Sequence, residues 1–152
     1  LVEKIRRVLP DVSLTSDLIV GFPAETGADF HDSCELLRRC RFDIVHTAAY
    51  SPREGTRAAV MDGQIDEAVK NARLNEINDL QSDIARELNE EYTGREVEVL
   101  VDGPAPRGKG MLQGRTMSDK VVIIPGGPDD CGRLLRVKIT RAGHWSLEGE
   151  RV

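Results

Sequence analysis

The chain has 152 residues, enough for one ordinary domain or two small ones, and its 39% apolar content is sufficient for packed cores. No apolar run approaches the roughly 20 residues that a membrane-spanning helix requires, so we expect a soluble, globular protein that does not span a membrane. The first residue is Leu1 rather than Met, which leads us to expect a piece of a longer protein. The net charge of −5 hides an asymmetry, because residues 1–92 carry 11 basic and 18 acidic side chains whereas residues 93–152 carry 10 basic and 8 acidic ones. A basic second part is compatible with a module that contacts nucleic acid.

The chain begins with a predicted helix followed by a predicted strand. The apolar side chains of residues 2–9 fall on one helical face, and Pro10 ends the pattern. Residues 14–22 are a near-continuous run of aliphatic and β-branched side chains bounded by turn signals. Such a run is typical of a strand that is buried on both faces of a parallel sheet.

A second helix and a second strand repeat this pattern. Residues 25–40 predict a crossover helix, with acidic side chains near its start and Phe30, Cys34 and Leu37 at helical spacing. Residues 41–52 return to strand character, which ends at Pro52. Helix, strand, helix, strand is the order of a parallel α/β sheet. Because so few strands would leave edges uncovered, we expect further strands outside these residues.

The second half of the chain changes from helical to β character near Gly94. Residues 64–94 carry one long amphipathic stripe that predicts one helix or two, packed on its domain by one face. After Gly94, short β-rich runs are separated by Gly, Pro and Asp turns and predict a small all-β barrel. The residues of the helical stripe are Ile65, Val69, Ala72, Leu74, Ile77, Leu80, Ile84 and Leu88.

The chain lacks the motifs of a self-contained catalytic site. It has no paired-Cys metal spacing, no P-loop, no His-Glu-x-x-His and no nucleophile elbow. The three cysteines are odd in number and widely separated, which favours free thiols in a reducing compartment. We therefore expect neither a catalytic residue nor a metal site among these residues.

The turn after the first predicted strand, VGFPAET, lies where α/β folds place ligand sites. Gly21 would let a ligand approach the backbone closely, Pro23 would stiffen the turn, and Glu25 could accept hydrogen bonds from an amine or hydroxyl. A tight strand-to-helix connection with Glu25 as a capping acid explains the same residues. The loop YSPREGTRAA follows the next strand on the same rim, so the two loops could share one pocket, or Arg53 and Arg57 could be merely solvated.

The β-rich part concentrates basic side chains that could place positive charge on one barrel face, as in small barrels that bind nucleic acid. A solvated surface explains most of these charges equally well. Because Tyr92 and Trp145 are the only aromatic side chains in or near this part, phosphate and loop contacts are favoured over base stacking. The basic residues are Arg107, Lys109, Arg115, Lys120, Arg133, Arg136, Lys138 and Arg141.

Five segments resemble the radical S-adenosylmethionine methylthiotransferases, which thiomethylate transfer RNA or a ribosomal protein. They are TSDLIVGFPAET, FDIVHTAAYSPREGT, RLNEINDLQSDIARELNEEYTG, VLVDG and LQGRTMSDKVV, in the family's order and spacing. The match covers nearly the whole chain. Two positions depart from it, since Ala24 stands where the family usually has Gly and Glu54 where it usually has Pro.

The resemblance implies an α/β part followed by an all-β part. Residues 1–75 would be the C-terminal strands and helices of a partial TIM-like barrel, the radical S-adenosylmethionine domain. Residues 76–92 would form a connecting helix, and residues 93–152 a small β-barrel of the TRAM type.

The resemblance also implies a cofactor site. In the S-adenosylmethionine pocket, Ile19 would lie beside the adenine and Gly21 would give backbone clearance. The remaining cofactor-binding residues would be Glu25, Tyr50 and Ser51. The family's two 4Fe-4S clusters need cysteines at ligand spacing, which these residues lack, so we expect the cofactors only in the full-length enzyme and the chain alone to be inactive.

Among the family's branches, GRTMSDKVVIIPG resembles the one that adds a methylthio group to N6-isopentenyladenosine beside the anticodon of tRNA. We expect a cytoplasmic protein whose partners are the tRNA anticodon stem-loop and N-terminal domains of the same chain. The alternatives are a branch acting on threonylcarbamoyl adenosine, a methylthiotransferase of a ribosomal protein, and a non-catalytic RNA-binding module. The expected RNA contacts are Arg107, Lys109, Arg115 and Lys120.

Overall fold

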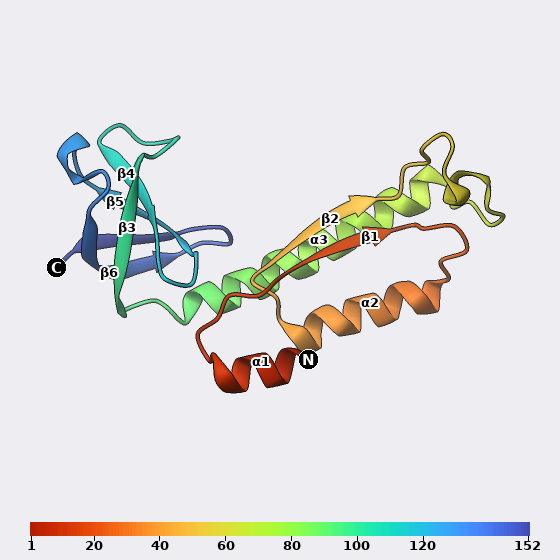
Figure 1. Ribbon diagram of the computed structural model, residues 1–152, viewed down its shortest axis with the longest axis horizontal. Helices are drawn as coiled ribbons and strands as arrows, with labels where there is room; N and C mark the ends of the chain where they lie inside the picture. Colours follow the sequence, from red (N-terminus) through yellow and green to blue (C-terminus); the bar gives the residue numbers. More distant parts are fainter. The chain divides into compact units, whose positions relative to one another are not determined.

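The computed structural model describes residues 1–152, which divide into two compact units. We call Leu14–Ile84 the α/β unit, and Leu1–Ser13 together with Ala85–Val152 the barrel unit. Figure 1 shows the elements, which in chain order are α1 (Val2–Val8), β1 (Thr15–Val20), α2 (Gly27–Cys40), β2 (Ile44–Ala49), the 3-10 helix η1 (Arg57–Val60), α3 (Glu67–Glu90), β3 (Glu96–Pro104), β4 (Met111–Arg115), β5 (Val121–Pro125), the 3-10 helix η2 (Pro128–Asp130), β6 (Leu134–Ala142) and β7 (Leu147–Arg151).

Helix α1 forms where the sequence predicts it but buries none of its residues. It ends at Val8, two residues before Pro10, which lacks the N–H that a further helical turn would need. Val8 is 77% exposed, whereas Val2 and Ile5 are partly covered, so only part of the apolar stripe of α1 is packed.

The strands β1 and β2 form a parallel two-stranded sheet in the α/β unit, as Figure 1 shows. Val20 pairs with Ala49, so the carboxyl ends of the two strands lie together. Val20 and Val45 are buried on one face, whereas Ile19 is 57% exposed on the other. The parallel pairing is confirmed. The prediction that β1 is buried on both faces is wrong, because the elements of the unit cover only one face of the sheet.

Helix α2 starts with a capping box. The Thr26 hydroxyl accepts a hydrogen bond from the Asp29 N–H at 3.2 Å, and the Asp29 carboxylate accepts one from the Thr26 N–H at 2.8 Å. These bonds satisfy N–H groups that have no partner within the first helical turn. Phe30, Cys34 and Leu37 are buried, as their helical spacing predicts.

Helix α3 is a single helix of 24 residues, which decides between the predicted alternatives of one helix and two. Ile77 and Ile84 of the predicted stripe are buried, but Val69 is 41% exposed. Neither α3 nor any other helix is long and apolar enough to cross a membrane. The buried face of α3 also carries three polar side chains, Lys70, Gln81 and Asn89.

The strands β3, β4, β5, β7 and β6 close, in that order, into a five-stranded barrel. This confirms the predicted small all-β barrel. Neighbouring strands are antiparallel except for the pair β5 and β7. Gly114 lets two strands approach closely, since a Cβ at this position would lie 2.4 Å from the carbonyl oxygen of Leu100. The core of the barrel consists of Val99, Val101, Leu112, Val122, Ile124, Leu135, Val137, Ile139 and Leu147.

Candidate functional site

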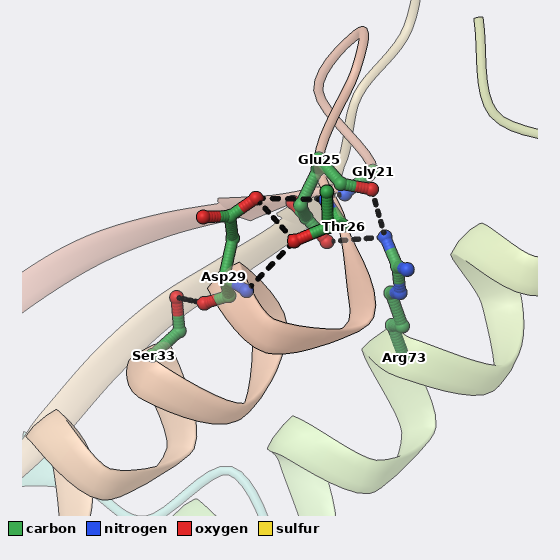
Figure 2. A network of polar contacts seen from close by, with 6 residues as sticks. All are labelled: Gly21, Glu25, Thr26, Asp29, Ser33 and Arg73. Carbon is green, nitrogen blue, oxygen red and sulfur yellow. Dashed lines mark hydrogen bonds and ion pairs between the residues drawn. The ribbon is translucent and has the colours of Figure 1, made fainter. Parts of the chain in front are cut away.

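The turn that the sequence singles out as a ligand site lies at the carboxyl end of β1 and is closed by its own hydrogen bonds. Figure 2 shows the Gly21 N–H donating to Glu25 Oε2, at 2.7 Å. The Glu25 N–H donates to the Phe22 carbonyl at 2.9 Å. Gly21 has a φ of 72°, a left-handed conformation that glycine adopts at no steric cost. The turn is therefore fixed by its backbone and by one carboxylate oxygen.

The other oxygen of the Glu25 carboxylate binds α3. Arg73 Nη1 donates to Glu25 Oε1 at 2.6 Å and to the Glu25 carbonyl at 3.2 Å, as Figure 2 shows. The Glu25 and Arg73 side chains are only 13% and 14% exposed, and the Arg73 guanidinium also lies over the Phe30 ring. Both oxygens of the carboxylate that the sequence offers to a ligand are thus engaged within the α/β unit.

The residue that caps α2 is Thr26, so the interpretation of Glu25 as a capping acid is wrong. Glu25 instead ties the turn to α3. Hydrogen bonds from the Thr26 hydroxyl and the Thr26 N–H lower the pKa of Asp29, because both bonds favour the ionised carboxylate. The start of α2 is therefore held by the pair Thr26 and Asp29.

The space beside Gly21 is filled by Lys70 of α3. A Cβ added at Gly21 would lie 2.2 Å from Lys70 Cγ, closer than any real contact allows. Lys70 is 3% exposed, and its ammonium group donates to the Tyr50 carbonyl at 3.1 Å and pairs with Glu67. The clearance that the sequence assigns to a ligand is thus used by Lys70, which connects α3 to both rim loops.

Tyr50, the first residue after β2, packs on the turn after β1. Its N–H donates to the Val20 carbonyl at 2.8 Å, and its ring meets the Phe22 ring edge-on at 5.2 Å. The Tyr50 hydroxyl is buried and has no hydrogen-bond partner. Ile19 lies on the open face of the sheet, and Ser51 is exposed in the loop. The structure thus brings Gly21, Glu25 and Tyr50 together at one rim.

Lys70 and Arg73 were not predicted as residues of this site. Lys70 precedes the buried Ile77 by seven residues, a spacing that places both on one face of a helix. A charged residue at such a position is normally taken as solvated, because burying an unpaired charge is costly. The helical spacing was therefore the only feature of the sequence that could indicate burial of these residues. It does not show which groups bind the two cations.

The four predicted RNA-contact residues lie at two ends of the barrel. Arg107 and Lys109 are exposed in the loop between β3 and β4. Arg115 ends β4 and Lys120 precedes β5, so both lie at the opposite end of these strands. The four side chains therefore do not form one cluster.

Five basic side chains of the barrel are paired with carboxylates. Arg115 contacts Asp119 at 2.8 Å and Asp102 at 3.5 Å. Arg107 and Lys109 make no salt bridge. Two exposed positive charges in the loop between β3 and β4 are therefore available to meet an anion. The other pairs join Arg136 to Glu96, Arg141 to Glu148, and both Arg133 and Arg151 to Asp130.

A cleft of about 720 Å³ opens in the barrel unit beside the turn between β4 and β5. It is lined by residues 9–13, Tyr92, residues 95–98 and residues 116–119. Its volume is within the roughly 300–1,000 Å³ range of small-molecule sites. The cleft was not predicted from the sequence, because its lining comes from segments that are far apart in the chain.

Tyr92 lines this cleft and contacts one hydroxyl and two cationic side chains. Its hydroxyl is 3.0 Å from Ser118 Oγ. The Arg95 guanidinium lies 5.5 Å from the ring centroid, and the Lys120 ammonium lies 5.9 Å from it. Two cations are thus held beside one aromatic ring, an arrangement that the ring quadrupole stabilises.

The structure does not assemble a metal site or an iron–sulfur site from its own side chains. No group of three or more His, Cys, Asp or Glu side chains could hold a metal ion. Cys34 is buried in α2, and burial raises the pKa of its thiol, whereas Cys131 is exposed on the barrel. Cluster ligation needs several thiolates together, so these residues do not fit an iron–sulfur cluster.

Known proteins resemble both units. Residues 90–152 match the TRAM domain family. The chain is 50% identical over all 152 residues to a tRNA-2-methylthio-N(6)-dimethylallyladenosine synthase of Moorella thermoacetica, of which it covers 34%. It is 49% identical over 99% of its length to the synthase of the same name in Syntrophomonas wolfei, again covering 34%, and 45% identical over 98% of its length to that of Bacillus velezensis, covering 29%.

The chain therefore spans about a third of the length of the curated relatives that it matches. The similarity includes the α/β unit as well as the barrel unit, because it runs from one end of the chain to the other. The predicted resemblance of the chain to the tRNA-modifying methylthiotransferases is thus confirmed.

Proposed function

We propose that the chain is part of a methylthiotransferase that modifies N6-isopentenyladenosine next to the anticodon of tRNA by radical S-adenosylmethionine chemistry. The main support for the proposal is the similarity, along the whole of this chain, to synthases whose names specify methylthiolation of this adenosine in tRNA. The α/β unit would contribute to the cofactor pocket, and the TRAM domain would bind tRNA in the cytoplasm. Residues outside these 152 would complete the enzyme.

The open face of the β1–β2 sheet supports the assignment of the α/β unit to a larger, TIM-like barrel. In such a barrel, helices cover the outer face of each strand, and side chains of the other face fill the interior. Val20 and Val45 are buried on one face, while Ile19 and Ile44 are exposed on the other. Further parallel strands on both sides would cover the exposed apolar side chains.

The carboxyl ends of β1 and β2 would hold S-adenosylmethionine. Ile19 offers an exposed apolar surface for the adenine, Ser51 an exposed hydroxyl, and Tyr50 a buried hydroxyl that lacks a partner. Gly21 and Glu25 would act through the shape of the turn, since their polar groups already bind each other.

When bound, S-adenosylmethionine supplies the radical chemistry and the methyl group. The two 4Fe-4S clusters that this chemistry uses would be held by residues outside the chain, because its own cysteines do not fit a cluster. We therefore expect the chain alone to bind RNA but to lack transferase activity.

The TRAM domain would contact tRNA mainly through phosphates. Arg107 and Lys109 are exposed and make no salt bridge, so their charges are available. Lys120 lies beside the Tyr92 ring at the other end of the barrel. Arg115 is paired with Asp119, and its contribution should be smaller because RNA must compete with that carboxylate.

The proposal is tested by fluorescence anisotropy of the chain with a labelled tRNA anticodon stem-loop, titrated across a salt series. Affinity should fall steeply with salt, and Arg107→Ala and Lys109→Ala should each reduce the slope of log affinity against log salt by about 1. Arg136→Ala, which removes a cation already paired with Glu96, is the matched control and should change the slope less.

A peptide from a ribosomal-protein loop is titrated in parallel. Binding of this peptide without binding of RNA would contradict the tRNA assignment and favour a methylthiotransferase of a ribosomal protein. Salt-insensitive RNA binding would contradict the phosphate contacts.

A further inference from the structure

We infer that the cleft of the barrel unit beside Tyr92 receives one unpaired RNA base that carries an exocyclic amino group. This inference rests on the proposed tRNA partner and adds a base-recognition subsite to it. The cleft holds about 720 Å³, which is enough for a nucleotide-sized ligand by the usual range of such sites. Its wall is rigid, its rim carries an apolar side chain without packing partners, and its charges suit a base rather than a phosphate.

The rigid wall is the turn between β4 and β5. The Thr116 N–H donates to the Lys120 carbonyl at 3.0 Å, and the Lys120 N–H donates to the Thr116 hydroxyl at 3.1 Å. The Thr116 and Ser118 hydroxyls are 3.1 Å apart, and Ser118 also binds the Tyr92 hydroxyl. A wall that is already ordered loses little conformational entropy when a ligand binds.

Met117 stands at the tip of this turn with 95% of its surface exposed. A fully exposed methionine on an ordered turn contributes nothing to the core, so its apolar surface is available to a ligand. Thioether sulfur makes favourable contacts with aromatic rings, and a nucleobase presents such a ring. Arg95 lines the same cleft, and its planar guanidinium can stack on a base.

The charges of the cleft select the base over the phosphate. Asp11 and Glu98 line it and make no salt bridge. Two free carboxylates repel a phosphate but accept hydrogen bonds from exocyclic amino groups, which adenine, cytosine and guanine have and uracil lacks. Lys120, beside the Tyr92 ring at the end of the turn, is placed to meet the phosphate that flanks the base.

This arrangement gives the two ends of the barrel different roles in RNA binding. The loop with Arg107 and Lys109 lies at the other end of β4 and would supply phosphate contacts that are independent of sequence. The cleft would supply the discrimination between bases. Variants at the two ends should therefore have different signatures, one changing overall affinity and the other changing preference.

The test measures binding of the full chain to three labelled probes by fluorescence anisotropy at constant salt. The probes are a short oligo(A), an oligo(U) of equal length, and a blunt duplex. The chain should prefer oligo(A). Met117→Ala should weaken oligo(A) binding by roughly two- to tenfold, the usual effect of losing a contact between a thioether sulfur and an aromatic ring. Glu98→Gln should reduce the ratio of oligo(A) to oligo(U) affinity by about fivefold or more, because a base-specific hydrogen bond is weakened.

Matched controls separate these effects from changes in folding and net charge. Leu134→Ala also truncates an exposed apolar side chain, but one that does not line the cleft, and should leave the ratio unchanged. Glu150→Gln removes one exposed carboxylate outside the cleft and measures the general effect of charge. Arg107→Ala and Lys109→Ala should weaken binding to oligo(A) and oligo(U) equally. Thermal melting of each variant checks that the fold is retained.

The outcomes test the cleft inference separately from the proposed binding of tRNA. RNA binding with unchanged oligo(A) affinity in Met117→Ala and an unchanged ratio in Glu98→Gln would overturn the cleft inference and leave the tRNA proposal intact. Tighter binding to the duplex than to oligo(A) would also overturn it. Absence of binding to all three probes would overturn the RNA partner itself, and the cleft inference with it.

Discussion

Ala24 adopts the left-handed backbone conformation, with a φ of 68°. A side chain in this conformation costs roughly 1–2 kcal/mol because its Cβ crowds the backbone. The Ala24 N–H also donates to the Gly63 carbonyl at 2.8 Å, and a Cβ at Gly63 would lie 3.2 Å from Ala24, so the two turns are closely packed. Glycine would fit at this position without strain.

We therefore expect Ala24→Gly to stabilise the chain by about 1 kcal/mol, less whatever is lost through the greater freedom of glycine in the unfolded state. Urea denaturation with a fixed slope measures the change. Ala28→Gly is the control, because Ala28 lies within α2 and its replacement should destabilise by roughly 0.5–1 kcal/mol. Destabilisation by both substitutions would show that the φ of Ala24 carries no strain.

The carboxylate of Asp29 gives the start of α2 a pH dependence. Its pKa lies below the usual 3.8, because the Thr26 hydroxyl and N–H bind the ionised form. A group whose pKa is depressed on folding contributes stability that is present above the unfolded value and is lost as the pH falls through the folded value.

The free-energy difference between the wild type and Asp29→Asn should therefore be constant near neutral pH and shrink as the pH falls below about 4. Denaturation curves at a series of pH values measure it, and Asp32→Asn, an exposed acid later in α2, is the control. A difference that grows on acidification would contradict the assigned direction of the pKa shift.

At the scale of elements, α3 fixes the rim of the β1–β2 sheet through Lys70 and Arg73. The stem of Lys70 occupies the space where Gly21 would carry a Cβ, and its ammonium binds the Tyr50 carbonyl. Arg73 binds the Glu25 carboxylate. The geometry of both rim loops thus depends on two successive turns of one helix.

Gly21→Ala should destabilise the chain by roughly 2–4 kcal/mol, since it combines a left-handed φ with overpacking against Lys70. In a Lys70→Ala background only the tight contact with the Cβ of residue 70, at 3.2 Å, remains, and the cost should fall to about 1–2 kcal/mol. A double-mutant cycle measures this coupling. Gly55→Ala is the control, because Gly55 has a φ of 78° but open space around it. Additive effects of the two substitutions would contradict the contact.

The elements themselves could be predicted because their signals are local. The spacing of Phe30, Cys34 and Leu37 identifies the buried face of α2 without any knowledge of its partners. The buried polar residues of α3 could not be predicted in this way. Gln81 donates to the Phe42 carbonyl, 39 residues away, and Asn89 donates to carbonyls more than 50 residues away, so their satisfaction depends on tertiary contacts.

The candidate site was predictable to the same extent. A turn at the carboxyl end of a parallel strand follows from the order of helices and strands, which the sequence contains. The order of helices and strands does not predict the ion pair between Glu25 and Arg73, because 48 residues separate the two. A basic face on the barrel was also expected from composition, but cross-strand pairs such as Arg136 and Glu96 neutralise much of it.

At the scale of the whole molecule, the two units differ in how their apolar side chains are covered. The nine core residues of the barrel all come from its own strands, and closure of the barrel leaves no strand edge unpaired. The β1–β2 sheet has two open edges and one exposed face, on which Ile19 is 57% exposed. Less apolar burial gives the α/β unit less stability against local unfolding.

Hydrogen exchange should therefore separate the units. Peptides from β3 to β7 should exchange more slowly than peptides that contain β1 or β2, when followed by mass spectrometry under native conditions. Helix α3 provides the internal comparison, because Glu67–Ile84 belongs to the α/β unit and Ala85–Glu90 to the barrel unit. The first part of α3 should exchange at the same rate as β1 and β2. The last turns of α3 should exchange as slowly as the barrel strands. Uniform protection of all strands and of the whole of α3 would mean that the chain unfolds as one cooperative body, and that the open face of the sheet costs it no local stability.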